Sequence, residues 1–199
     1  RAADLMAWVE SLVERGVKDM NLDQFGGNYR LKPVASALKH NNYFVSLRVS
    51  DVSRETAVSA AAVAMIKNCT LRRLTVRNVD AKYEGFEAFG KVMKGNGKMA
   101  VTHLDLSHAE MTDRGAAGLA PGLAAYHTRM SELRLSHMAV TATGAEQLVT
   151  AMYANDKHAF ETLELLDLSA NPLTGMAGSR LVDLLKKRRA ASDIPFSLL

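Results

Sequence analysis

Apolar and polar residues follow one fixed frame over most of this chain. The clearest copy runs from Val101 to Met111, where apolar residues stand at the first, fourth, sixth, ninth and eleventh positions. The apolar residues two positions apart in this frame are typical of one buried face of a strand. The frame opens five more segments, at Val17, Met20 and Leu22; Phe44, Leu47 and Val49; Leu71, Leu74 and Val76; Met130, Leu133 and Leu135; and Leu163, Leu166 and Leu168. Six copies predict a repeat architecture.

This frame is the strand half of a leucine-rich repeat. Successive copies start 27 to 33 residues apart, which leaves room for one helix after each strand. We therefore expect an α/β fold, a right-handed solenoid or horseshoe with parallel strands on the concave face and helices on the convex face. Residues 1–16 are expected to form a capping helix or the end of a preceding repeat. Residues 17–195 would form six repeats, and residues 196–199 would begin a further, truncated repeat.

Helical periodicity between the strands predicts the second half of each repeat. The expected helices are Arg1–Glu14, Leu31–Lys39, Ser53–Lys67, Tyr83–Lys94, Thr112–Tyr126, Thr141–Tyr153 and Leu173–Arg189. Ser53, Thr112 and Thr174 are expected N-caps, and Pro121 should kink or split its helix. The extra residues around Gly95–Gly97 and Ala154–Lys157 are interpreted as grown surface loops. Only Asn171 fills the usual asparagine position of the repeat, so we expect the other turns to satisfy their backbone in another way.

Charge and cysteine content narrow the class of protein. The 25 basic and 21 acidic residues include no dominant polybasic tract, so nucleic acid is not an expected partner. The longest uncharged run, between Arg114 and Arg129, falls short of the roughly 20 residues that span a bilayer, so no transmembrane segment is expected. The lone Cys69 cannot form an internal disulfide, which favours a reducing, cytoplasmic setting. We expect its thiol to be buried, and we interpret Asn68–Thr70 as a chance match to the glycosylation pattern.

Several segments resemble a particular family of repeat proteins. They are Asn21–Phe25, Leu31–Pro33, Ala37–Leu38, Asn42–Phe44, Val101–Ser107 with Asp113–Gly115, and Leu166–Leu173. Together they resemble the leucine-rich domain of the CARMIL proteins, which are actin-regulating scaffolds. The resemblance implies a solenoid that lies next to a lipid-binding domain, and a cytoskeletal or membrane-associated setting. It implies no actin chemistry at any residue of this chain, because the family's capping-protein-binding stretch lies in a separate tail.

Charged residues at alternate strand positions are the candidate partner-binding residues of the concave face. Arg48, Arg73 and Arg77 are expected close together on two adjacent strands, where they would attract an acidic segment or an anionic membrane surface. Solvated surface arginines are the alternative interpretation. The following strands place Asp105, Arg134 and Asp167 at one equivalent position, which predicts an acid-base-acid ladder across neighbouring strands.

Neither a metal site nor a catalytic set is predicted. His108 and His137 occupy equivalent positions after adjacent strands, but Asn78 and Ala170 stand where a third ligand would be needed. Asp105, Ser107 and His108 lie on one short segment, whereas a triad converges from separate segments. We therefore expect no cofactor and no enzyme activity, and a scaffold that binds protein partners. The alternative is a small-GTPase activator of the Ran-activator type, and an inhibitor resembling ribonuclease inhibitor is disfavoured because this chain is neither cysteine-rich nor acidic.

Overall fold

Seven parallel strands form one sheet whose spatial order is the order of the chain. The computed structural model describes residues 2–25, 31–50, 57–79 and 81–174, together with 179, 183, 186, 197 and 198. The strands are β1 (Asp19–Asn21), β2 (Ser46–Ser50), β3 (Arg73–Arg77), β4 (His103–Asp105), β5 (Glu132–Arg134), β6 (Leu165–Asp167) and β7 (Ser197–Leu198). Leu47, Leu74, Leu104, Leu133 and Leu166 stand in register across five of them. The predicted strand frame is confirmed.

A helix follows each of the first five strands and returns the chain to the start of the next. After α1 (Ala2–Glu14), the helices are α2 (Leu31–Leu38), α3 (Ala57–Met65), α4 (Tyr83–Gly95), α5 (Thr112–Ala124) and α6 (Ala142–Tyr153), with a short 3₁₀ helix, η1 (Leu22–Phe25), after β1. The helix expected over Leu173–Arg189 lies almost wholly outside the described residues, as does the Ser53 cap.

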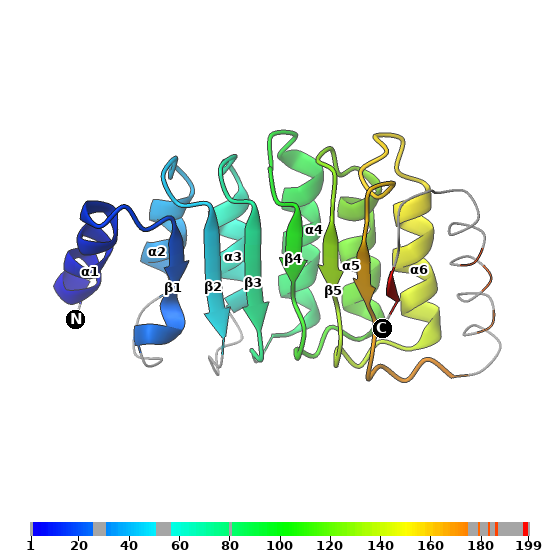
Figure 1. The fold of residues 1–199 in the computed structure, drawn as a ribbon. Helices are drawn as coiled ribbons and strands as arrows, with labels where there is room; N and C mark the ends of the chain where they lie inside the picture. Colours follow the sequence, from blue (N-terminus) through cyan, green and yellow to red (C-terminus); the bar gives the residue numbers. More distant parts are fainter. Residues whose placement is uncertain are drawn as a thin grey trace.

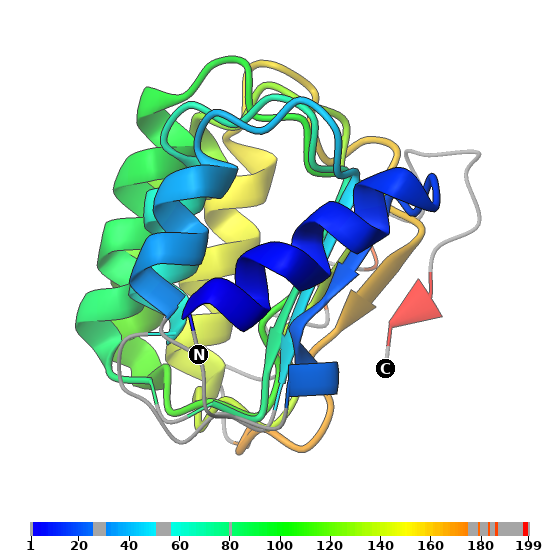
Figure 2. The same ribbon diagram turned by 90° about the vertical axis from the view of Figure 1, so that its left-hand side faces the viewer.

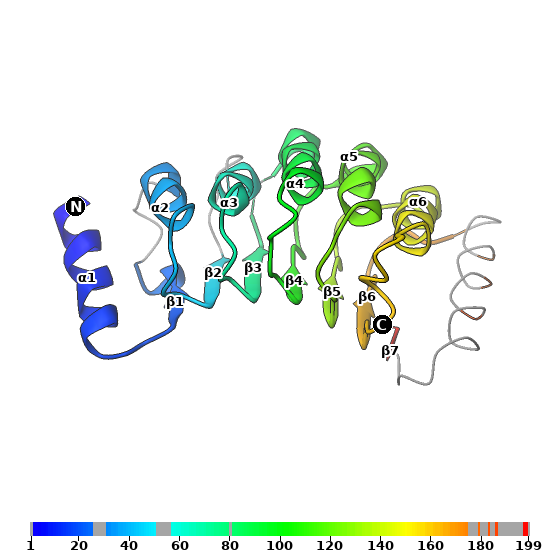
Figure 3. The same cartoon turned by 90° about the horizontal axis from the view of Figure 1, so that it is seen from above.

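The strands and helices form two layers. In Figure 1 the strands run downward in front, the helices lie behind, and each new strand lies to the right of the last, so the solenoid is right-handed as predicted. Seen from above, the stack follows a shallow arc with the strands on its inner side (Figure 3). The other two edges of each repeat are loops. The sheet therefore presents one broad concave face whose side chains come from every repeat.

Helix α1 covers the first end of the stack. It crosses the gap between the helix layer and the sheet (Figure 2) and buries Leu5 and Leu12 there. The opposite side of α1 leaves Met6 and Val13 exposed. Helix α1 thus packs against the first repeat and contributes apolar side chains to its core.

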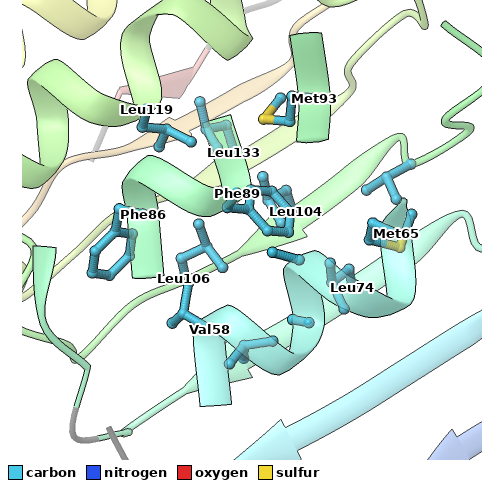
Figure 4. Close-up of a cluster of buried hydrophobic side chains, with 14 of the residues drawn as sticks. Val58, Met65, Leu74, Phe86, Phe89, Met93, Leu104, Leu106, Leu119 and Leu133 are labelled. Carbon is cyan, nitrogen blue, oxygen red and sulfur yellow. The ribbon is translucent and has the colours of Figure 1, made fainter. Parts of the chain in front are cut away.

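The core lies between the two layers and is continuous along the stack. In Figure 4 Phe86, Phe89 and Leu104 lie with Leu106 and Leu119 among the side chains of neighbouring repeats, and all five are 0 or 1% exposed. The leucines come from the inward positions of the strands, and the phenylalanines come from the inner side of α4. Helices that alternate with strands at this spacing bury their apolar sides against the sheet, which is why the strand frame recurs.

Two helix predictions need correction. Pro121 lies inside α5, which runs unbroken from Thr112 to Ala124, so the expected split is wrong. Proline has no amide hydrogen to donate to the Ala117 carbonyl, and the helix continues past it for three residues despite this lost bond. Thr112 does not cap this helix, because Met111 occupies the N-cap position and no side chain bonds there. Thr141 instead caps α6, where its hydroxyl accepts a hydrogen bond from the Thr143 amide at 3.2 Å.

Asparagines at the corner between helix and strand link consecutive repeats. Asn68 donates to the carbonyls of Leu38 and Asn41, Asn96 donates to those of Met65 and Asn68, and Asn155 donates to those of Leu123 and Tyr126. These bonds satisfy carbonyls at the ends of α2, α3 and α5, which have no partner within their own helix. Asn155 is only 7% exposed, whereas Asp156 and Lys157 beside it are exposed, so the surface loop predicted here carries one buried side chain that anchors it.

One corner uses other side chains for the same purpose. Where α5 ends, the Tyr126 hydroxyl donates to the Val101 carbonyl at 2.6 Å and the Thr128 hydroxyl donates to the Met99 carbonyl. Burial raises the pKa of the Tyr126 hydroxyl well above its ordinary value, so this donor stays protonated. On the opposite edge, Asn171 donates to the Leu135 carbonyl and accepts from the amides of Met138 and Val140.

Candidate functional site

The concave face is built from the outward side chains of each strand, which stand in three rows. Strand register places Arg73 beside Ser46 and His103, and Thr75 beside Arg48 and Asp105. Asp105 in turn stands beside Arg134, and Arg134 stands beside Asp167. Because neighbouring strands are about 4.8 Å apart, each row is a line of side chains within reach of one another. The face therefore displays its charges in a fixed order along the solenoid.

The three arginines predicted as a cluster divide into two groups. Arg73 and Arg77 lie on β3 on either side of Thr75, whereas Arg48 stands beside Thr75 on the neighbouring strand. The three arginines therefore lie close together on one surface, but each belongs to a different row. Among the residues that the structure describes, no acid pairs with Arg73 or Arg77. Those two define the basic patch of the concave face.

Arg48 is neutralised by an acid that the sequence analysis left out. Its Nε lies 2.8 Å from Oδ2 of Asp23, which η1 carries to the edge of β2. Burial opposes ionisation of Asp23, but hydrogen bonds from the Ser50 hydroxyl and amide and from Arg48 outweigh it, so the pKa of Asp23 is lowered. The Arg48 side chain remains 49% exposed, yet its charge is already matched. It is therefore a weaker candidate for binding an anion than its neighbours on β3.

The predicted ladder has the expected register but a different ion pair. The Arg134 guanidinium bonds to the carboxylate of Glu132, two residues earlier on the same strand, and not to Asp105 or Asp167. The bond to Glu132 is the main cause of a raised Arg134 pKa, and the charges of Asp105 and Asp167 add to it. Glu132 shares the outward face of β5 with Arg134 because side chains two apart on a strand lie on the same side.

Asp105 and Asp167 are fixed by their own backbone. The Asp105 carboxylate accepts a hydrogen bond from the Ser107 amide, and the Asp167 carboxylate accepts bonds from the amide and hydroxyl of Ser169. Asp167 is only 7% exposed, so its side chain offers little surface for contact with a partner. With Glu132 these two carboxylates form what we term the acidic patch, in which Asp167 contributes charge and the other two also contribute accessible surface.

The two histidines after β4 and β5 do meet, but not as ligands. Their rings are stacked with centroids 4.2 Å apart and planes 15° apart. A metal must lie in the plane of each imidazole that binds it, and one ion cannot lie in two nearly parallel planes at this separation. Both residues have positive φ, 60° at His108 and 53° at His137, as do Asn78 and Ala170 at the equivalent positions. The shared backbone conformation explains why the side chains stack.

Other candidate chemistry is accounted for by the fold. In the described part of the chain, no three histidine, cysteine or acidic side chains lie in an arrangement that could hold a metal ion. The Cys69 thiol is exposed, so its predicted burial is wrong. Asn68, the residue before it, turns inward instead and is 1% exposed with its amide bonded to two carbonyls, which leaves no room for a glycan. No helix in the described residues has the length and apolar character to cross a membrane.

Comparison with known proteins agrees with this architecture. A family model for leucine-rich repeats matches residues 99–120, the repeat that contains the clearest copy of the strand frame. The fold is a leucine-rich-repeat solenoid. The chain resembles the mouse protein "Capping protein, Arp2/3 and myosin-I linker protein 3" with 28% identity over 140 residues, and Protein CARMIL of Dictyostelium discoideum with 26% identity over 151 residues. The human counterpart of the mouse protein is 27% identical over the same length.

The likeness covers most of this chain but little of each relative. It spans 70% of the chain and 10% of the mouse protein, and 74% of the chain and 14% of the Dictyostelium protein. The leucine-rich-repeat domain is therefore the part that is shared. Repeats of this kind provide extended surfaces for binding other proteins, and the concave face described above is such a surface.

Two features of the concave face escaped sequence reasoning. Asp23 follows its strand by two residues, and only the 3₁₀ turn brings it back against Ser50 and Arg48. Glu132 could have been found, because it stands two residues before Arg134 and so must share its face. Alternation along β5 places Glu132 and Arg134 on the same side of the strand, whereas a comparison of equivalent positions in different repeats does not consider this pair.

Proposed function

We propose that this leucine-rich-repeat domain is the non-enzymatic binding module of an actin-regulating scaffold, and that its concave face holds an acidic segment of a protein partner. The mouse and human relatives are named as linkers of capping protein, Arp2/3 and myosin-I. A chain that shares their repeat domain is suited to the same kind of assembly. This function places the protein in the cytoplasm, at the cytoskeleton.

The basic patch is the observation that carries the binding site. Arg73 and Arg77 lie on one strand, two rows apart, with no acidic partner among the described residues. Unpaired guanidinium groups on a preformed surface attract carboxylates and can bind them with two parallel hydrogen bonds. The neighbouring Arg48 and Asp23 form a neutral pair that adds no competing charge. An acidic segment is therefore the ligand that the basic patch best matches.

Direct binding of purified components tests the proposal. The domain is immobilised and exposed in turn to capping protein, Arp2/3 complex and myosin-I at low and high salt. Binding to at least one of them is expected, with association at least tenfold slower when Arg73→Glu and Arg77→Glu are combined. The matched control is Lys91→Glu with Lys94→Glu, which changes the same charge on the exposed side of α4.

The outcomes separate the candidate functions. Binding that the control variant keeps and the β3 variant loses supports the proposal. Equal loss in both variants would show that net charge alone mattered, and no binding to any of the three components would reject the actin-scaffold role. A purified small GTPase of the Ran type is assayed alongside, and we expect its GTP hydrolysis to be unchanged by the domain. Acceleration that depends on a concave arginine would favour the GTPase-activator function instead.

A further inference from the structure

The concave face carries two patches of opposite charge side by side, not a single basic surface. The basic patch consists of Arg73 and Arg77 on β3, and the acidic patch consists of Asp105, Glu132 and Asp167 on β4, β5 and β6. In the acidic patch three carboxylates face the one guanidinium of Arg134, so negative charge prevails. The change of sign occurs between adjacent strands.

The internal ion pairs leave this separation in place. Arg48 is bonded to Asp23, and Arg134 is bonded to Glu132, so the internal pairs form within each half of the face. In the described part of the chain, no ion pair crosses from β3 to β4. The residue of β3 directly beside Asp105 is Thr75, which carries no charge. The backbone bonds that hold Asp105 keep its carboxylate oriented toward its own strand end.

The side-chain contacts also explain why the halves do not neutralise each other. Arg73 stands beside His103, whose Nδ1 lies 2.8 Å from the Thr102 hydroxyl, and not beside an acid. Arg77 lies one row beyond Asp105 and is level with Ser107 on the next repeat. The Ser107 hydroxyl accepts a hydrogen bond from the Ser136 amide. Neither Arg73 nor Arg77 therefore has an acid beside it on β4, and a partner molecule can reach both patches.

We propose that the partner segment is itself bipolar, with acidic residues over β3 and basic residues over β4 to β6. The distance across the sheet from β3 to β5 or β6 is two or three strand spacings, or about 10 to 14 Å. Four residues of extended chain span about 13 Å, and residues four apart lie on the same side of such a chain. The segment thus carries an acidic residue and a basic residue four positions apart, and it crosses the strands. This inference rests on the proposed function, because it describes the partner of the same face.

The alternatives considered for this face predict different binding. A wholly acidic segment would gain at β3 but would be repelled by the acidic patch, and an anionic membrane would meet the same repulsion over a larger area. A wholly basic segment would be repelled by Arg73 and Arg77. Only a segment with both signs in the right order gains at both ends, so the face selects by sequence order as well as by charge.

Three synthetic peptides test the idea with the intact domain. The first, Glu-Thr-Glu-Thr-Lys-Thr-Lys, has separated charges, the second has the same composition with Glu and Lys alternating at those positions, and the third has four glutamates. Their binding is measured by fluorescence anisotropy at low and at high ionic strength. We expect the separated peptide to bind at least fivefold more tightly than the alternating one, and the difference to shrink at about 0.5 M salt because exposed charges are then screened.

Two charge variants decide the orientation. In the domain with Arg73→Glu and Arg77→Glu, the separated peptide should lose its advantage, and a fourth peptide, with lysines at all four charged positions, should bind best. In the domain with Glu132→Lys, the four-glutamate peptide should overtake the separated one. Lys91→Glu with Lys94→Glu on α4 should leave the order of the peptides unchanged.

The results distinguish this inference from the proposed function. If the four-glutamate peptide binds wild-type domain as well as the separated peptide, the bipolar partner is rejected while an acidic ligand stands. If no peptide binds but vesicles with anionic lipids bind through Arg73 and Arg77, both are overturned in favour of a membrane surface. If peptides follow the predicted order but no actin component binds, the inference stands and the actin role fails.

Discussion

Ala170 adopts a left-handed backbone conformation that its side chain disfavours. Its φ is 53°, and Asn78, His108 and His137 share this conformation at the equivalent place in their repeats. The amides of those three residues donate to the carbonyls of Ser107, Ser136 and Ser169 in the next repeat. The repeat thus requires the left-handed conformation whatever residue is present, and asparagine tolerates it better than alanine or histidine.

Glycine at this position should stabilise the domain. Ala170→Gly removes the Cβ clash of the left-handed conformation and is expected to raise the free energy of unfolding by about 1 kcal/mol. The same change in α6, Ala151→Gly, should lower it by about 0.5 to 1 kcal/mol, because glycine loses more conformational freedom in a helix. Urea unfolding of both variants measures the difference. A loss of stability in both would mean that the turn after β6 does not need positive φ.

At the scale of the element, the helices are held at their ends by the next repeat. Asn155 donates to two carbonyls near the end of α5 and accepts from the amides of Lys157 and Ala159. Asn68 makes the same kind of double connection at the end of α2. Helix ends leave carbonyls without partners, so a buried asparagine that satisfies them fixes both the helix and the corner that follows.

Removal of one such asparagine should be costly. Asn155→Ala removes the side-chain partner of the Tyr126 carbonyl and of the Ala159 amide, and we expect the free energy of unfolding to fall by about 1 to 3 kcal/mol. Asn42→Ala is the control, because that residue is exposed and lies at a comparable corner. Thermal unfolding followed by circular dichroism compares the two. Equal melting temperatures would show that water replaces the asparagine at this corner.

Helices α4 and α5 approach closely because glycines face one another. A Cβ added at Gly90 would overlap the carbonyl oxygen of Gly118, and one added at Gly122 would lie 2.6 Å from the Gly90 oxygen. Neither obstacle is a flexible side chain, so the helices would have to separate. This contact is therefore decided by the smallest residue on each helix.

A methyl group in this contact should weaken the domain. Gly90→Ala is expected to cost about 1 to 3 kcal/mol of unfolding free energy, because it forces apart two packed backbones. At Gly95, at the end of the same helix, an added Cβ meets nothing within 4 Å, so Gly95→Ala should be neutral or stabilising. Denaturant unfolding of the two variants checks this, and similar losses in both would contradict the packing argument.

For the whole molecule, each repeat is stabilised mainly by its neighbours. Leu104 pairs in register with Leu74 and Leu133, and the core around it joins α4 to the flanking repeats. In the part of the chain that the structure describes, each strand pairs only with the strands next to it in the sheet order. A local defect should therefore spread to the adjacent repeats and weaken with distance along the stack.

Hydrogen exchange can show this decay. Leu104→Ala, at a residue 1% exposed, should cost about 2 to 5 kcal/mol by opening a cavity, as should Leu133→Ala. Amide exchange in the Leu104 variant should accelerate most in β3, β4 and β5 and least in β1. Uniform acceleration would mean that the domain unfolds as one unit, and unchanged stability would mean that the strand frame is wrongly placed.

The sequence by itself determined the repeat. Leucines at fixed positions dictate which side of each strand is buried, and the interval between copies leaves room for one helix, so strand order, parallel pairing and the register of Leu104 with Leu133 all followed. The outward positions of Arg48, Arg73, Asp105 and Arg134 followed from the same alternation.

Only the tertiary structure decided which charges remain unmatched. Asp23 pairs with Arg48 because a 3₁₀ turn brings it back to β2. Arg134 pairs with Glu132 on its own strand and not with the acids on the two neighbouring strands. Asp167 is buried. The burial of Asn155 and exposure of Cys69 were likewise fixed by how the corners fold. Periodicity specifies the side of an element on which a residue lies, because that depends on local geometry. The partner of a long charged side chain depends on rotamers and on turns between elements, and no periodic pattern encodes those.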